Sequence, residues 1–461
     1  MSKKQIRIGG GAGYSEDLLR PALDLMEQGN LDYIIFECLA ERTIAVAQLQ
    51  KLQNPDKGYN GKLEQRMKKI LPLAKKHGIK VITNMGVANV EKAVELTAEL
   101  ARSLGLEGLK IAGVCGDDVF SGIDRHQDKA IMENGIVLSE FSKELVSANA
   151  YLGYEGIAQA LEQGADVVIT GRCADAALVV GPLVYEFGWN SYEQLGIATS
   201  AGHLMECAGY LTGGYFANPG YSSVPDFWNV GYPICEVEAD GTFYLTKLEG
   251  TGGGVDCATC TQQLLYEIGD PAKYLTPYCI ADFSNIQFEE VAPNRVKVTG
   301  ATGRAPTGLY KVSLGYRDGF IGTSEFSFGG LGAYERCQWA FELARKRWEM
   351  LGLSAEETRF DIIGYNSIVD GENIPKPDTA TLTDLRSRIS VRSGERALAQ
   401  ELLEEATAGL SVHAAGSGLM TIAVKEVIAV VSILIPATEP TVTIIYQETS
   451  PSQPERKGDA L

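Results

Sequence analysis

Three apolar segments of this sequence end in side chains that could bind or transform a ligand. The segments are residues 31–36, 81–82 and 167–169, and the polar residues that follow them are Glu37, Asn84, Arg172 and Asp175. A carboxyl group held in a partly apolar crevice has a raised pKa and can act as a general acid or base. An arginine at such a place can bind a carboxylate or a phosphate through two parallel hydrogen bonds. The pattern is typical of proton-transfer chemistry on an anionic substrate.

The same residues could instead serve only the fold. Glu41 and Arg42 begin the next predicted helix and could form a local ion pair. Arg172 and Asp175 could pair in the same way across the turn that follows their segment. The sequence leaves both interpretations open.

His203 and Glu206 form a second candidate acid–base pair. They lie three residues apart in a predicted helix, and Cys207 follows one turn beyond His203. Zinc binds such side chains, but the rest of a ligand set is missing, so we expect no metal. A proton-transferring pair and a pair that only packs are both compatible with the spacing. Residues 257–260 form a lone C-x-x-C, which we interpret as incidental.

Three glycine-rich segments could present backbone N–H groups to an anion. Their residues are Gly11 and Gly13, Gly213 and Gly214, and Thr251, Gly252 and Gly253. The first segment lies between a predicted strand and a helix, and Glu37 follows where a ribose-binding acid would stand in a dinucleotide-binding fold. Its spacing is G-x-G-x-G instead of G-x-G-x-x-G, and Glu16 and Asp17 would repel a pyrophosphate. A plain turn and a hinge are competing interpretations, and no cofactor is assigned.

Alternating strand and helix signals must position these residues. Strands are predicted near residue 6 and at 32–36, 80–83, 109–114 and 166–170, with helical patterns between them. Such alternation predicts a mostly parallel, doubly wound sheet, with a βα barrel as the alternative. The carboxyl ends of parallel strands meet at one edge, where ligands bind.

From about residue 232 the pattern changes to antiparallel hairpins followed by mixed helices and strands. We therefore expect an N-terminal α/β domain at 1–275 that carries the site. A C-terminal α+β domain is expected at 276–449, and a disordered tail at 450–461.

Composition disfavours several functional classes. The formal charge of −18 opposes binding to nucleic acid or to an anionic membrane. The apolar run at 427–435 is far shorter than the roughly 20 residues that span a bilayer. Nine cysteines, several of them in apolar runs, are typical of free thiols in a reducing compartment. We expect a cytoplasmic homo-oligomer.

Taken in order, these segments resemble the acyclic terpene utilisation (AtuA-like) protein family. The matching segments are residues 11–15, 36–43, 83–86, 116–118, 147–153, 169–175, 202–207, 212–216, 250–253 and 263–267. The resemblance implies a role in the catabolism of citronellol- and geraniol-like terpenes through carboxylic acids and acyl-CoA thioesters. It assigns no catalytic residue.

These observations lead to one functional hypothesis and two alternatives. We expect an enzyme that acts on a small carboxylate or an acyl-CoA thioester by acid–base chemistry of the lyase or hydratase type. Glu37 and the His203–Glu206 pair would move protons, and Asn84 and Asn149 would orient a carbonyl group. Arg172 and the glycine segments would bind anionic groups. The alternatives are a ligand-binding subunit that works with a small, separately encoded partner, and an NAD-dependent oxidoreductase.

Overall fold

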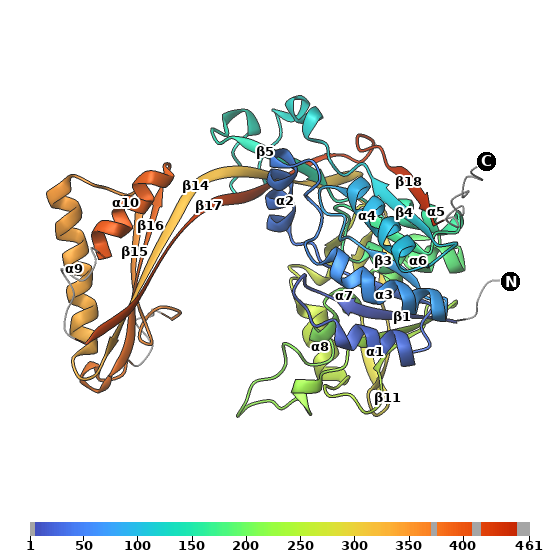
Figure 1. Cartoon of the computed structure of the whole chain (residues 1–461). Helices are drawn as coiled ribbons and strands as arrows, with labels where there is room; N and C mark the ends of the chain where they lie inside the picture. Colours follow the sequence, from blue (N-terminus) through green and yellow to red (C-terminus); the bar gives the residue numbers. More distant parts are fainter. Residues whose placement is uncertain (1–4, 370–375, 408–415, 450–461) are drawn as a thin grey trace, which may run out of the picture. The chain divides into compact units, whose positions relative to one another are not determined.

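The computed structural model describes residues 5–369, 376–407 and 416–449, which form two compact units. Unit 1 comprises residues 1–142, 146–315 and 430–461, and unit 2 comprises residues 143–145 and 316–429. Strands β14 (Leu309–Gly329) and β17 (Ser417–Pro436) each run from one unit into the other (Figure 1).

Unit 1 is built on a mixed sheet with the strand order β11-β12-β8-β7-β1-β2-β3-β6-β4-β18. The central strands are parallel: β1 (Gln5–Ala12), β2 (Tyr33–Phe36), β3 (Lys80–Thr83), β6 (Val167–Thr170) and β4 (Lys110–Cys115). The outer strands pair antiparallel: β7 (Pro233–Glu238), β8 (Phe243–Lys247), β12 (Arg295–Thr299), β11 (Gln287–Ala292) and β18 (Thr443–Glu448). The short central strands are buried on both faces, which is why their sequences are apolar.

Helices cover both faces of this sheet. On one face lie α1 (Arg20–Gln28), α3 (Leu63–His77) and α4 (Val90–Ser103), which share a core with Ile34 and Phe36 of β2 (Figure 1). Tyr33 points to the opposite face, since side chains alternate along a strand, and its hydroxyl donates to Glu186 at 2.7 Å. Glu186 belongs to α6 (Ala177–Phe187), which packs with α5 (Glu155–Glu162) and α7 (Tyr192–Glu206).

Further elements of unit 1 lie outside the large sheet. They are α2 (Glu41–Gln53), β5 (Leu145–Ala150), α8 (Cys257–Leu265) and a small sheet of β13 (Thr302–Arg304), β10 (Ile280–Asp282) and β9 (Tyr274–Leu275). Helix α7 begins with a capping box between Ser191 and Gln194, which fixes the start of the helix that carries His203 and Glu206.

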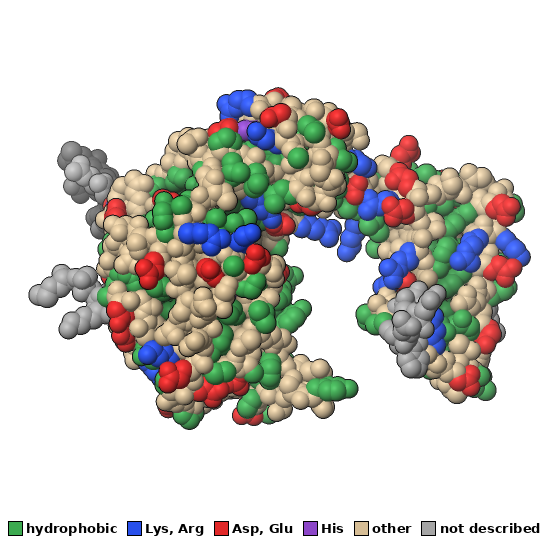
Figure 2. Space-filling model, turned by 180° about the vertical axis from the view of Figure 1, so that it is seen from behind, with side chains coloured by type: hydrophobic (Ala, Val, Ile, Leu, Met, Phe, Trp, Pro, Cys, Tyr) green, Lys and Arg blue, Asp and Glu red, His purple; other side chains and the backbone are tan. Residues whose placement is uncertain are grey.

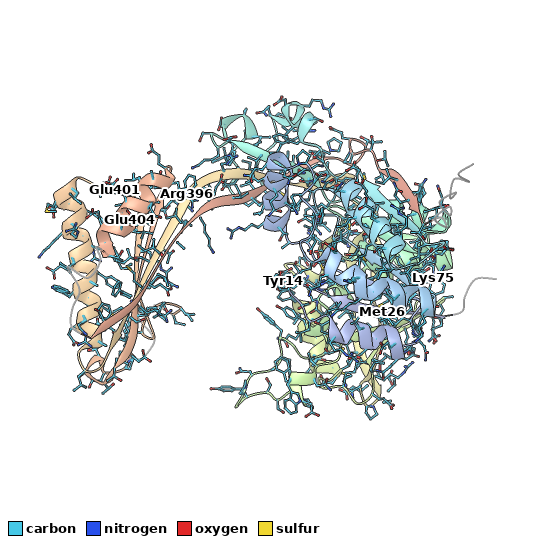
Figure 3. The ribbon with its side chains drawn as sticks, viewed as in Figure 1. Tyr14, Met26, Lys75, Arg396, Glu401 and Glu404 are labelled. Atoms are coloured by element: carbon cyan, nitrogen blue, oxygen red, sulfur yellow. The ribbon has the colours of Figure 1, made fainter. Side chains whose placement is uncertain are left out.

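Unit 2 has the chain order β14, α9 (Ala333–Leu351), β15 (Glu357–Ile363), β16 (Asp384–Ser393), α10 (Arg396–Thr407) and β17. Its antiparallel strands lie in the order β15-β16-β14-β17, which is the β-α-β-β-α-β arrangement of a split βαβ fold. Helix α10 buries Ala399, Leu402 and Leu403 in the core. Arg396, Glu401 and Glu404 occupy its exposed side (Figure 3).

The expected mixed α/β architecture is confirmed, together with the hairpin of β7 and β8 and the antiparallel C-terminal region. The sheet is open and carries antiparallel strands at both ends, so it is more mixed than the sequence predicted. One local prediction was wrong: residues 9–12 belong to strand β1 and do not form a loop after it. Glycine is required there for packing, because a Cβ at Gly11 would lie 2.6 Å from the ring of Phe36. The expected tail at 450–461 lies outside the described residues.

Surface charge is mixed. On the face shown in Figure 2, basic side chains are interspersed with acidic and apolar ones. Within the described ranges, no helix has the length and apolar character that crossing a membrane requires.

Candidate functional site

Glu37 and Asn84 meet at the carboxyl edge of the sheet. They follow the neighbouring parallel strands β2 and β3, so the strand ends bring them together. The Asn84 amide nitrogen donates to Glu37 Oε1 at 2.8 Å, and Asn84 Oδ1 accepts from the backbone N–H of Cys38 at 2.8 Å. The backbone N–H of Leu39 donates to the same Glu37 oxygen at 2.9 Å. These bonds hold the carboxyl group in one orientation.

Burial raises the pKa of Glu37 to about 8. The nearby Asp175 carboxylate raises this pKa further, whereas the Arg172 charge and the hydrogen bonds from Asn84 and Leu39 lower it. Glu37 is therefore mostly protonated at neutral pH and can exchange a proton there.

This raised pKa predicts a pH-dependent stability. Between about pH 4.5 and pH 8 the folded chain binds more protons than the unfolded chain, so its free energy of unfolding should fall as pH rises. Relative to Glu37→Gln, which cannot ionise, the wild-type chain should lose on the order of 2–4 kcal/mol across this range. Urea unfolding of both chains at several pH values measures the difference. A difference that does not change with pH would contradict the raised pKa.

Arg172 holds the loops at this edge together. Its guanidinium group donates to the carbonyl oxygens of Leu39, at 2.6 Å, and Cys173, at 2.6 and 2.9 Å, and it pairs with the Asp175 carboxylate. Burial opposes its charge most strongly, but Asp175 together with Tyr151, Cys173 and Glu37 outweighs burial and raises the pKa of Arg172, which keeps it charged. Its carbon Cζ lies 4.5 Å from the ring centroid of Tyr151. Most of its hydrogen-bonding capacity therefore serves the protein itself.

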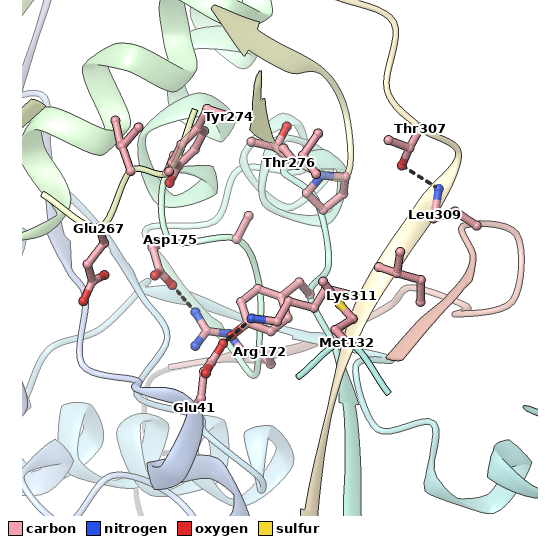
Figure 4. A pocket seen from close by; sticks show the side chains of 18 of the residues that line it. Glu41, Met132, Arg172, Asp175, Glu267, Tyr274, Thr276, Thr307, Leu309 and Lys311 are labelled. Carbon is pink, nitrogen blue, oxygen red and sulfur yellow. Dashed lines mark hydrogen bonds and ion pairs between the residues drawn. The ribbon is translucent and has the colours of Figure 1, made fainter. Parts of the chain in front are cut away.

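A cavity of about 810 Å³ opens beside these residues, entirely within unit 1 (Figure 4). Its polar lining includes Glu41, Arg42, Tyr151, Arg172, Asp175, Glu267, Asp270, Lys273 and Lys311. The residues come from the start of α2, the end of β5, the turn after β6, the loop around β9, and strand β14. Glu37 does not line the cavity. Asp175 does line it, and the charge of Asp175 raises the pKa of Glu37.

Glu41 is the centre of a charged cluster in the cavity wall. The Tyr151 hydroxyl donates to Glu41 Oε1 at 2.6 Å, and the Lys311 ammonium group donates to the same oxygen. Burial tends to raise the pKa of Glu41, but the bonds from Lys311 and Tyr151 outweigh it and the pKa is lowered. Sequence reasoning missed Tyr151 and Lys311 as site residues. The family-like segment at 147–153 pointed near Tyr151, whereas Lys311 lies in a strand without such a signal.

His203 and Glu206 form the expected hydrogen bond. His203 Nδ1 lies 2.9 Å from Glu206 Oε1, and Nε2 lies 3.1 Å from the carbonyl oxygen of Leu264. Because a carbonyl oxygen only accepts, Nε2 carries a hydrogen, and a further proton is shared between Nδ1 and Glu206. The imidazole ring lies against Phe283 and against Tyr274, which lines the cavity.

The same pair has shifted pKa values. Burial raises the pKa of Glu206 to about 7, although the charge of His203 lowers it. Burial tends to lower the pKa of His203, but the attraction of Glu206 outweighs it and the pKa is raised. Glu206 Oε2 is buried, and among the described residues it has no hydrogen-bond partner. The pair can hold a proton behind Tyr274.

Asn149 lies in a different network from Asn84. Its amide nitrogen donates to Asp117 Oδ2 at 2.9 Å, and that oxygen also accepts from the backbone N–H of Arg172 at 3.0 Å. Burial raises the pKa of Asp117 to about 6. Asn149 thus supports the turn that carries Arg172, and it does not line the cavity.

The Asp17 carboxylate accepts hydrogen bonds from backbone amides at the first glycine segment. Its Oδ2 accepts from the N–H groups of Gly13, at 2.8 Å, and Tyr14, at 3.0 Å. A pyrophosphate would have to displace this carboxylate, so the geometry gives no support to a nicotinamide cofactor there.

Gly13 is required by close packing. A Cβ at this position would lie 2.4 Å from Cys207 Cα, so Gly13→Ala should lower the free energy of unfolding by about 1–3 kcal/mol. Gly61→Ala is the matched control, because nothing lies within 4 Å of its Cβ position. Urea unfolding compares the two variants. Equal stabilities would show that the backbone shifts freely at Gly13.

The other two glycine segments pack against each other, away from the cavity. The amides of Gly213, Gly214, Gly252 and Gly253 donate to the carbonyl oxygens of Tyr210, Gly209, Asn229 and Pro225. Gly253 has φ +81° and its Cβ would lie 2.6 Å from the carbonyl oxygen of Thr212. Thr251 accepts from the Lys247 ammonium group through both its hydroxyl and its carbonyl oxygen. These contacts account for the glycines as structural residues.

The described residues contain neither a disulfide nor a cluster of metal ligands. All nine cysteines are free thiols, including the C-x-x-C pair. Within the described ranges, no group of three or more His, Cys, Asp or Glu side chains is arranged to hold a metal ion.

Comparison with known proteins identifies one family. The family model described as acyclic terpene utilisation family protein AtuA matches residues 6–446 of the chain. No curated protein and no solved structure matches the chain.

Proposed function

Because this chain belongs to the acyclic terpene utilisation family AtuA, which implies a role in acyclic terpene utilisation, we propose that it is an enzyme of that catabolism. The proposed substrates are small carboxylates or acyl-CoA thioesters, and the proposed reaction is a proton transfer of the lyase or hydratase type.

The observation that carries this proposal is Glu37, a carboxyl group with a pKa of about 8 held next to a charged cavity. A general acid or base works best when its pKa lies near the operating pH. Glu37 is 9% exposed and does not line the cavity, so in the proposal a bridging water connects it to the substrate. In the proposal Glu37 transfers the proton, and Asn84 and the Leu39 amide keep its carboxyl group aimed.

Two further groups have supporting roles in the proposal. The His203–Glu206 pair, with a Glu206 pKa of about 7, takes up or returns a second proton through the region of Tyr274. Arg172 shapes the cavity wall and contributes positive charge beside Asp175. Both Glu37 and Glu206 feel the charge of Asp175, and acid–base catalysis commonly uses two titratable groups at one site.

Deuterium exchange tests the proposal. The purified chain would be incubated in D₂O with a panel of small saturated and α,β-unsaturated carboxylates and their CoA thioesters, followed by NMR. We expect enzyme-dependent incorporation of deuterium next to the carbonyl group, or addition of water across the double bond. Binding without exchange or addition for every compound would contradict an enzyme and favour a ligand-binding subunit. Turnover only with added NAD would favour an oxidoreductase.

A further inference from the structure

The cavity has an apolar side that proton transfer at Glu37 does not use. Met132, Leu275, Leu309 and Leu434 all line it, and we call these four residues the apolar wall. Each is a large hydrophobic residue left exposed, by 54%, 62%, 37% and 37% respectively. Single exposed apolar residues are ordinary, but several that converge in one concave surface mark a binding surface for an apolar group.

A positive charge lies directly beside this wall. Leu309 and Lys311 are two residues apart in β14, so their side chains point to the same face of the strand. The Lys311 ammonium group donates to Glu41 and lies 5.2 Å from the ring centroid of Tyr151. An ammonium group has three donors, and among the described residues Glu41 is the hydrogen-bond partner of Lys311. Lys311 therefore keeps donors for a ligand.

Leu309 of the apolar wall lies apart from two acidic side chains of the cavity (Figure 4). In Figure 4, Glu267 and Asp175 lie on one side of the Glu41–Lys311 pair and Leu309 on the other. The lining holds equal numbers of basic and acidic side chains: Arg42, Arg172, Lys273 and Lys311, and Glu41, Asp175, Glu267 and Asp270. Such a balance leaves Lys311 for one negative charge but provides no excess of positive charge for a group with several phosphates.

We propose that this cavity binds an aliphatic carboxylate, with its charged end on Lys311 and its hydrocarbon chain along the apolar wall. Lys311 and the wall are then the determinants of specificity, and the free acid is preferred over its CoA thioester. This inference rests on the proposed function, because it assumes that this cavity is the substrate site.

Calorimetric titration of the full chain tests this directly. The ligands are straight-chain carboxylates from butanoate to decanoate, the matching primary alcohols, and octanoyl-CoA. We expect affinity for the acids to rise about fourfold per added methylene group, as burial of apolar surface requires. Each alcohol should bind at least about tenfold more weakly than its acid, because it lacks the charge.

Variants separate the two determinants. Lys311→Met should reduce the affinity for each acid to that for its alcohol, and Lys311→Arg should restore most of it. Lys346→Met is the matched control, since Lys346 also pairs with a glutamate, Glu342, but on α9 of unit 2. Leu309→Ser and Leu434→Ser should flatten the dependence on chain length, whereas Leu331→Ser, at an exposed site in unit 2, should not.

Equal affinity for acids and alcohols, no dependence on chain length, tighter binding of octanoyl-CoA than of octanoate, or no binding at all would overturn this inference. The outcome is separable from that of the proposed function. Binding as expected without turnover of any compound overturns only the enzymatic proposal. Turnover that does not depend on the chain length of the acid and is unchanged by substitution of Lys311 overturns only the specificity proposal.

Discussion

Replacement of Glu37 with Gln is expected to lower kcat/KM by about 10²–10⁴-fold while the fold survives. The amide has the shape of the carboxylic acid and can still accept from Asn84 and Leu39, which both bond to Glu37 Oε1. It cannot transfer a proton at neutral pH. Since Glu37 is mostly protonated there, the substitution also removes little charge.

Steady-state kinetics with the substrate found by deuterium exchange would measure this effect. Circular dichroism and urea unfolding would show that the fold is retained. Glu64→Gln, at an exposed position on α3, is the matched control and should leave kcat/KM unchanged. Full activity of Glu37→Gln would remove Glu37 from the mechanism and leave the His203–Glu206 pair as the remaining acid–base candidate.

Replacement of Arg172 with Met should cost about 3–5 kcal/mol of the free energy of unfolding. The side chain is 1% exposed, and its loss would leave the carbonyl oxygens of Leu39 and Cys173 without their donor and Asp175 without its partner. Because Arg172 also packs on Tyr151, the cavity wall should become disordered and activity should fall with stability.

Urea unfolding would measure this loss. Arg20→Met is the control, because Arg20 pairs with Asp24 on the surface and is 73% exposed, so its loss should hardly change the free energy of unfolding. Arg172→Lys should recover only part of the stability, since one ammonium group cannot reach three acceptors in the geometry of a guanidinium group. A cost below about 1 kcal/mol for Arg172→Met would show that the loops at the sheet edge hold themselves in place.

Local patterns were enough to predict the strand-end residues and the acid–base pair. Glu37 and Asn84 come after segments that are apolar because they are buried on both faces, and parallel strands bring their carboxyl ends to one edge. The three-residue spacing of His203 and Glu206 on a helix predicted their hydrogen bond. The chemical roles of these residues remain proposals.

The hydrogen-bond partners of the candidate residues could not be predicted from local sequence patterns. From the sequence, the backbone amides of the glycine segments were expected to be available to an anion. In the fold these amides donate to Asp17 or to backbone carbonyl oxygens. Asn149 was expected to orient a carbonyl group together with Asn84, yet it lies within β5 and bonds to Asp117. Which acceptor reaches a given donor depends on packing between segments, and a pattern within one segment does not contain that information.

The periodicity of the chain was therefore sufficient for its mixed α/β class and for the edge of the sheet at which polar residues gather. The order of the strands, the antiparallel strands at both ends of the sheet and the cavity itself were settled by tertiary structure alone. Lys311 illustrates the reason, because it reaches Glu41 across a separation of 270 residues. Buried strands and helix faces are imposed by neighbours a few residues away, whereas a cavity is closed by side chains that only the folded chain brings together.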